Sequence, residues 1–249
     1  MISTTYMFEH PGEQMLPGTV ANWFDKIKAT LKPETVQKIW QFYRDEGLIY
    51  ELENRTVMLW GAQKRTTTGV YSHGPVAHNI IVGWMRYVLA RSLEVADAEE
   101  LLISGLVHNT NRQEGLEAYK MGQRIKNTGL SKLFGSKVAR YAKITGYSAI
   151  ENVLLHVRHL PTCICFISDE MVAGTEIDDP HKKATRLLLD AQRVDSQYYK
   201  TNATGLRLYG RGALEVQRDL ARVVEIILAK KLNIRPATQF TSAVISLMG

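Results

Sequence analysis

The chain has 249 residues, of which 45% are hydrophobic, and its 31 basic and 25 acidic side chains give a net charge of +6. This length and composition allow a large buried core, so neither disulfides nor a metal is needed for folding alone. The charge suits a phosphate-bearing ligand, but the sequence has no long run of like charges and therefore no strong nucleic-acid signal.

The compartment is predicted from the N-terminus, the apolar runs and the cysteines. The opening residues, MISTTYMFEHPGEQ, lack the apolar segment of a secretion signal, and no uncharged apolar stretch is long enough to cross a membrane. Cys163 and Cys165 are separated by one residue, so a disulfide between them would be strained. We expect two reduced, buried thiols and a cytoplasmic protein with no membrane segment.

The N-terminal half predicts helices with one small hairpin between them. Apolar residues at helical spacing mark helices over residues 19–29, 35–46, 75–93 and 98–108. Asp97 is placed to cap the last of these. Residues 48–61 alternate more weakly, which predicts a minor β element that turns at Glu53-Asn54. Residues 64–69 are polar and basic and predict a loop.

The C-terminal half predicts more helices. They cover residues 116–125, 132–143, 149–160, 162–172, 179–194 and 213–232. Asp179-Pro180 is a favourable start, because aspartate caps a helix and proline fits its first position. Residues 205–212 predict a loop, and the tail from Pro236 is expected to be weakly structured. The fold class is all-α, and residues 1–249 are expected to form a single domain.

One buried carboxylate needs a partner. The helix over 162–172 is apolar almost all round, and Asp169 is its first ionisable residue. Burying an unpaired charge costs much free energy, so an arginine or a metal must compensate it.

Two histidines lie at helix ends that should meet. His78 lies near the start of one helix, and His108-Asn109 ends the next. Helices joined by a short loop pack antiparallel, which brings these ends together. If the two histidines and Asp169 bind one metal, their side chains should converge within about 5 Å, because metal–ligand bonds are about 2.0–2.2 Å long.

These residues resemble a known family. His78, His108-Asn109 and Asp169 resemble the H…HD…D signature of the HD-domain metal-dependent phosphohydrolases. The segments AHNIIVGWMRYVLARSL, AEELLISGLVHN and FISDEMVAG resemble its ligand helices. The resemblance covers about residues 70–195 and implies an HD-domain-like helical bundle, with helices 19–46 and 213–232 packed on it. Asp190 and Asp195 compete for the last ligand, and Asp169 is preferred because its helix is the most apolar.

Asn109 departs from the family pattern, which has aspartate there. An amide is a weaker ligand than a carboxylate, bridges two metals poorly, and leaves a divalent site with a net charge of about +1. Three explanations stay open. The lineage has lost or altered the chemistry, or aspartate was changed to asparagine to trap an inactive complex, or another carboxylate such as Glu114 or Glu117 binds the metal.

Further roles are assigned to polar residues near the ligands. The resemblance implies that His78, His108, Asn109 and Asp169 hold the metal. We assign catalysis to Asn109, Arg112 and Glu114, and substrate binding to Lys64, Arg65 and Lys120. His156 and His159 share a helix face and could serve a second metal, but core or surface histidines are the expectation.

The sequence leaves two main functions open. The first is a metal-dependent phosphohydrolase for a nucleotide or related phosphate ester, inactive as written if Asn109 disables it. The second is a non-catalytic HD-like binding or regulatory protein that has lost the metal centre. A third, a mixed-valent di-iron oxygenase, needs more ligands than the sequence places. The implied cofactor is Mn, Mg, Co, Ni, Fe or Zn, the implied partner is a phosphate-bearing small molecule, and apolar N-terminal helices could also serve a homo-oligomer.

Overall fold

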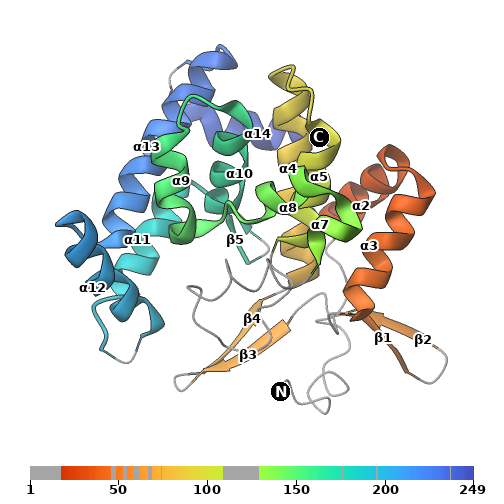
Figure 1. Cartoon of the computed structure of the whole chain (residues 1–249), viewed down its shortest axis with the longest axis horizontal. Helices are drawn as coiled ribbons and strands as arrows, with labels where there is room; N and C mark the ends of the chain where they lie inside the picture. Colours follow the sequence, from red (N-terminus) through yellow and green to blue (C-terminus); the bar gives the residue numbers. More distant parts are fainter. Residues whose placement is uncertain are drawn as a thin grey trace.

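The computed structural model describes residues 18–45, 49–52, 55–58, 62–66, 69–73, 75–108, 129–174, 176–194, 196–235 and 237–249. Helices dominate this part of the chain, and short antiparallel hairpins are its β structure, so the all-α prediction is confirmed. Figure 1 shows α4 (Pro75–Ser92), α5 (Ala98–Val107) and α10 (Leu160–Met171) in the middle of the molecule. The N-terminal helices lie on one side of them, and most of the C-terminal helices lie on the other (Figure 1).

The N-terminal elements follow the sequence predictions closely. Helices α2 (Gly18–Thr30) and α3 (Pro33–Asp45) bury one apolar face each. Strands β1 (Ile49–Leu52) and β2 (Arg55–Met58) pair with Leu52 opposite Arg55, so the minor β element is confirmed. The turn predicted at Glu53-Asn54 lies outside the described residues. The prediction of a loop over 64–69 is wrong. A second hairpin forms there, in which β3 (Ala62–Thr66) pairs with β4 (Gly69–His73).

Helices α4 and α5 cross with their backbones in direct contact. A Cβ atom added to Gly105 would lie 2.5 Å from the Gly83 Cα atom, which no side chain can tolerate. Glycine at the crossing therefore lets the two helices approach far more closely than side chains would allow. The helices run antiparallel, as predicted, so the start of α4 lies beside the end of α5 (Figure 1).

The middle of the chain is more broken than its periodicity predicts. Two helices replace the single one expected over 132–143, namely α7 (Leu130–Phe134) and α8 (Ser136–Ala142), because Gly135 between them has a φ of +89°. A 3-10 turn, η3 (Gly146–Ala149), leads into the short helix α9 (Ile150–Leu155), which ends before the predicted Leu160. Helix α10 is central to the core, as predicted, and its residues Pro161–Met171 are all buried.

The C-terminal part contains more helix than expected. A small hairpin, β5 (Val172–Ala173) with β6 (Glu176–Ile177), leads to α11 (Pro180–Asp190). The prediction of a loop over 205–212 is wrong for residues 205–209, which lie in α12 (Gln197–Tyr209). Gly205 of this helix touches Ala213 at the start of α13 (Ala213–Lys231). The tail also folds, as η4 (Ala237–Gln239) and α14 (Phe240–Met248). Phe240, Val244 and Met248 bury one face of α14 in the core.

The two cysteines are free, buried thiols, as predicted. Burial raises the pKa of each to about 11, so both stay protonated at neutral pH. Across the described residues, no helix combines the length and apolarity that crossing a membrane requires.

Arg86 ties the central helices together from inside the core. Its fully buried guanidinium donates to Ser168 Oγ at 3.1 Å, Ser104 Oγ at 2.8 Å and the Cys165 carbonyl at 3.1 Å. It also reaches the carbonyls of Tyr141 and Ile144, each at 3.4 Å. One side chain from α4 thereby links α5, α10 and the segment that follows α8.

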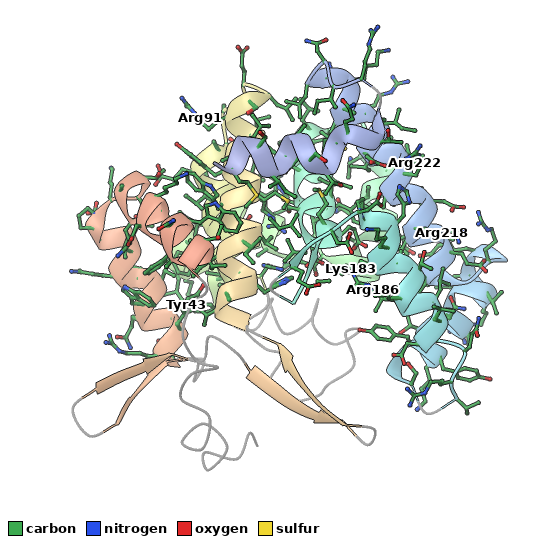
Figure 2. The ribbon with its side chains drawn as sticks, turned by 180° about the vertical axis from the view of Figure 1, so that it is seen from behind. Tyr43, Arg91, Lys183, Arg186, Arg218 and Arg222 are labelled. Atoms are coloured by element: carbon green, nitrogen blue, oxygen red, sulfur yellow. The ribbon has the colours of Figure 1, made fainter. Side chains whose placement is uncertain are left out.

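Replacing Arg86 should destabilise the fold strongly. We expect Arg86→Met to lower the free energy of unfolding by about 3 kcal/mol or more, since several buried acceptors lose their donor at once. Arg86→Lys should lose most of the same stability, because an ammonium cannot reproduce the planar fork of donors. Arg91→Lys, at the exposed far end of the same helix (Figure 2), is the matched control and should change stability by less than about 0.5 kcal/mol. Urea unfolding measures all three, and an Arg86→Met protein as stable as the control would contradict this role.

Asp97 occupies the N-cap position of α5, as predicted, but its side chain makes no capping hydrogen bond. Its carboxylate instead accepts from Lys137 Nζ at 2.7 Å and from the Tyr141 hydroxyl at 2.6 Å. These two hydrogen bonds hold the pKa of Asp97 below its ordinary value. The contact therefore links α5 to α8.

Stability should depend on pH through Asp97. A lowered folded-state pKa stabilises the protein above the unfolded pKa of about 4, and this contribution disappears as the pH falls through the folded value. Asp97→Asn should therefore lower the melting temperature at pH about 7, and its difference from the unchanged protein should shrink as the pH falls below about 4. Glu99→Gln, an exposed neighbour, is the control. A difference between Asp97→Asn and the unchanged protein that stays constant across this range would contradict the assignment.

Candidate metal centre

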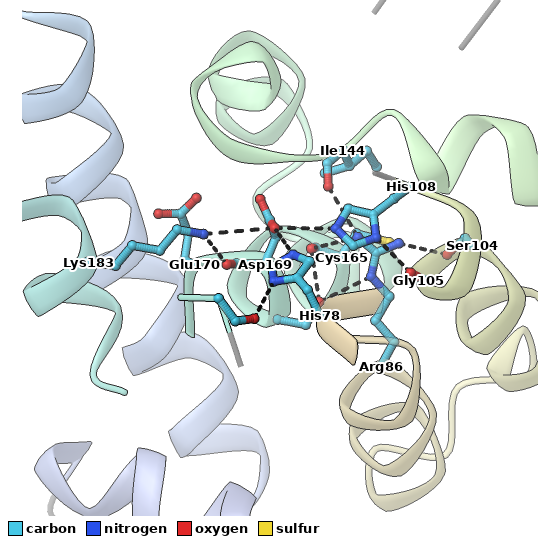
Figure 3. A network of polar contacts seen from close by, with 12 residues as sticks. His78, Arg86, Ser104, Gly105, His108, Ile144, Cys165, Asp169, Glu170 and Lys183 are labelled. Carbon is cyan, nitrogen blue, oxygen red and sulfur yellow. Dashed lines mark hydrogen bonds and ion pairs between the residues drawn. The ribbon is translucent and has the colours of Figure 1, made fainter. Parts of the chain in front are cut away.

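Three helix ends place the predicted ligands. His78 lies in the first turn of α4, His108 follows the last residue of α5, and Asp169 lies in the last turn of α10. The glycine crossing of α4 and α5 brings the two imidazole rings to a centroid distance of 5.3 Å. The three side chains are all buried, and Figure 3 shows them facing one another.

The ligand atoms form a tight triangle. His78 Nε2 lies 3.3 Å and His108 Nε2 lies 3.4 Å from the same oxygen, Asp169 Oδ1. One potential ligand atom from each residue lies within 4.8 Å of the others, as the sequence predicted for a shared metal. Among the described residues, this is the group of histidine, cysteine and acidic side chains that could hold an ion.

The two contacts with Asp169 Oδ1 are compatible with a shared metal ion as well as with long hydrogen bonds. Two ligands bound at about 2.1 Å lie about 3.4 Å apart in tetrahedral geometry and about 3.0 Å apart in octahedral geometry. Hydrogen bonds from nitrogen to oxygen usually measure about 2.7–3.2 Å. The observed separations of 3.3 Å and 3.4 Å are therefore long for hydrogen bonds but within the range that one ion would impose.

The other ring nitrogens fix the tautomers. His78 Nδ1 lies 3.2 Å from the Gly174 carbonyl oxygen, and His108 Nδ1 lies 2.6 Å from the Gly105 carbonyl oxygen. A carbonyl oxygen only accepts, so each Nδ1 carries the proton. In a neutral ring, Nε2 then presents a lone pair, which is the arrangement of a metal-binding histidine with an oriented ring.

Three acceptors therefore face one another in a buried space. Burial lowers the pKa of His108, and the nearby cation of Arg86 adds to the effect, against the opposing influence of Asp169. Burial alone would raise the pKa of Asp169, but the cation of Lys183, and hydrogen bonds from the histidine rings when they are protonated, hold it well below its ordinary value. A neutral His108 beside an ionised Asp169 leaves two lone pairs in opposition, and a cation between them removes the conflict.

Lys183 is the site residue that the sequence analysis missed. It lies in the first turn of α11, and its Nζ atom is 3.8 Å from Asp169 Oδ1 and donates to the Asp169 backbone carbonyl. The β5–β6 hairpin turns the chain back, so that the start of α11 lies beside the end of α10 (Figure 3). The apolar periodicity of the sequence does not reveal that the chain reverses direction here. The only hint in the sequence is a basic pair, Lys182-Lys183, after a helix cap.

Other candidates from the sequence lie apart from the triangle. Asp190 accepts from Ser196 Oγ at 2.9 Å and pairs with Arg193, so it serves the end of α11. Glu170 turns away from the histidines, as expected, and accepts from Gln217 Nε2 at 2.8 Å. Burial raises the pKa of Glu170 to about 7. His156 is exposed and His159 contacts Thr162 Oγ1 at 2.9 Å, which agrees with the expectation of ordinary histidines.

The remaining assignments stay predictions. Lys64 and Arg65 lie on β3, in the hairpin that ends at His73 shortly before α4 begins. The other assigned positions lie outside the described residues, and they are Asn109, Arg112, Glu114, Lys120 and Asp195.

Comparison with known proteins does not identify a family. The chain matches no protein-family model, no curated protein and no solved structure. The resemblance to the HD-domain phosphohydrolases therefore rests on the residues named above, and function has to be argued from the site itself.

The triangle should bind a divalent metal with a stoichiometry of about one per chain. We expect His78→Ala, His108→Ala and Asp169→Ala each to weaken Mn²⁺ or Zn²⁺ binding by more than about 100-fold, because each removes a direct ligand. His156→Ala, which removes an exposed imidazole, should leave affinity unchanged. Isothermal titration calorimetry measures the affinities, and circular dichroism confirms that each variant is folded. Tight binding that survives His108→Ala would contradict the assignment.

Proposed function

We propose that this chain is an HD-type metal-dependent phosphohydrolase acting on a nucleotide or a related phosphate ester. The observation that carries the proposal is the buried triangle of His78 Nε2, His108 Nε2 and Asp169 Oδ1, with both histidines oriented through Nδ1. The order of these residues along the chain supports the family, and the net charge of +6 is compatible with an anionic substrate.

The residues of the triangle have two roles, since one supplies charge and the other two supply oriented ligand atoms. Asp169 supplies a negative charge, and it is kept ionised in a buried place by the groups around it. His78 and His108 supply neutral donors whose directions are fixed by the carbonyls of Gly174 and Gly105. A divalent ion in such a site supplies Lewis-acid activation of water and of a phosphate group. Burial of all three side chains keeps competing water away from the donors.

A non-catalytic binding protein is the second candidate, and two observations favour it. Asn109 stands where the family has aspartate, which removes a carboxylate from the expected ligand set. Lys183 lies 3.8 Å from Asp169 Oδ1, so part of the charge of Asp169 is already balanced by the protein's own side chain. Under this alternative the pocket binds a nucleotide or simply packs.

Activity of the Asn109→Asp protein separates the two candidates. We expect the unchanged protein to show weak or no hydrolysis of a panel of nucleotides in Mn²⁺, Co²⁺ or Mg²⁺. Asn109→Asp should bind metal more tightly and raise kcat/KM by about tenfold or more, because a carboxylate is the stronger ligand. The double change Asn109→Asp with Asp169→Ala is the control and should be inactive. If aspartate at 109 neither tightens metal binding nor creates activity, the catalytic proposal is wrong.

A further inference from the structure

We propose that Lys183 is the anion-binding residue of this centre and that it holds a phosphate group of the substrate. The inference rests on the proposed function, and it goes further by giving the substrate a required charge and the site a specific contact. It is carried by the position of Lys183, by its unused donors and by the charge balance of the pocket.

Lys183 reaches the triangle from a separate element. Its ammonium approaches Asp169 from α11, whereas the two histidines come from α4 and α5 (Figure 3). Asp169 Oδ1 lies 3.8 Å from Lys183 Nζ. The same oxygen lies 3.3 Å from His78 Nε2 and 3.4 Å from His108 Nε2. A group bound beside the three donors would therefore lie within reach of the ammonium.

The ammonium is held in place but not saturated. A lysine has three N–H donors, and Lys183 uses one on the Asp169 backbone carbonyl. Its contact with Asp169 Oδ1 at 3.8 Å is too long for a hydrogen bond. The buried carboxylate of Glu170 is a second charged neighbour that interacts with Lys183 electrostatically. The side chain is 16% exposed, so a solute can reach it. Lys183 thus has N–H donors to offer beside the triangle.

The charge balance calls for an anion. With neutral histidines, the charges of Asp169 and Lys183 cancel. The other buried ionisable groups nearby, Arg86 behind the histidines and Glu170 beside Lys183, oppose each other in sign, so a divalent ion leaves an excess of positive charge in a buried site. Such an excess is costly unless a ligand neutralises it. A phosphate monoester dianion supplies this charge and accepts hydrogen bonds from an ammonium, whereas a neutral substrate does neither. Lys183 and the ion together therefore select a phosphate-bearing substrate.

The neighbouring basic residues lie farther out and provide controls. Lys182 is 69% exposed and pairs with Asp178 at 3.0 Å. Arg186, one turn farther along α11, pairs with the same carboxylate at 3.1 Å (Figure 2). Both neighbours are therefore paired with Asp178, away from the triangle.

Phosphate binding by the full chain tests the proposal. Calorimetric titration of inorganic phosphate into the Mn²⁺-saturated protein should show that Lys183→Met weakens phosphate binding by about tenfold or more. Lys183→Arg should retain most of the affinity, and Lys182→Met should match the unchanged protein. Mn²⁺ affinity without phosphate should be unchanged or higher in Lys183→Met, because a cation next to the ligands has been removed.

The outcomes separate this inference from the proposed function. If Mn²⁺ binds but Lys183→Met binds phosphate as tightly as the unchanged protein, Lys183 is not the anion contact and the metal centre stands. Weaker Mn²⁺ binding in Lys183→Met with normal phosphate affinity would show a structural role and overturn the inference. If no Mn²⁺ binds but phosphate binding still depends on Lys183, the anion site stands and the metal-dependent function fails. If neither binds, both fail.

Discussion

The arrangement of the site depends on the buried guanidinium of Arg86 and its hydrogen bonds. This guanidinium is fully buried, and among the described residues it is bound by hydroxyls and carbonyls and by no carboxylate. Its partners Ser104 and Ser168 lie on α5 and α10, the same helices that carry His108 and Asp169. The network therefore sets the spacing of the ligand helices, and it also places a positive charge behind the histidines. Burial lowers the pKa of His108, and this charge adds to the effect, which favours the neutral ring that a metal needs.

Beside this network, the polar and charged contacts of the site converge on one carboxylate oxygen. Asp169 Oδ1 faces two imidazole nitrogens and the ammonium of Lys183. Buried charges persist only when they are compensated, and here the compensation comes from α4, α5 and α11. A divalent ion adds positive charge to this buried cluster, so in our account it creates a demand for an anionic ligand. Metal binding and phosphate recognition are thus linked through the same carboxylate in our account.

The sequence was sufficient for the elements that follow local rules. Apolar periodicity located α4, α5 and α10, and the antiparallel packing of α4 and α5 predicted that His78 and His108 meet. Asp169 was added through its buried position in an apolar helix and the family resemblance, and it lies with the two histidines. Sequence reasoning failed where contacts between residues far apart in the chain determine the structure. Residues 240–248 form a helix because Phe240 and Val244 pack into the core, and Lys183 enters the site only because a hairpin reverses the chain. Gly135 breaks a helix whose apolar spacing continues across it, which periodicity alone does not reveal.

The central claim is that the three converging side chains bind one divalent ion. Anomalous X-ray diffraction from crystals of the full chain soaked in Mn²⁺ tests it most directly. Our account predicts an anomalous peak at about 2.0–2.2 Å from His78 Nε2, His108 Nε2 and Asp169 Oδ1, with the ring orientations unchanged. Absence of a peak there at a saturating Mn²⁺ concentration, or a peak held only by other residues, would contradict the account.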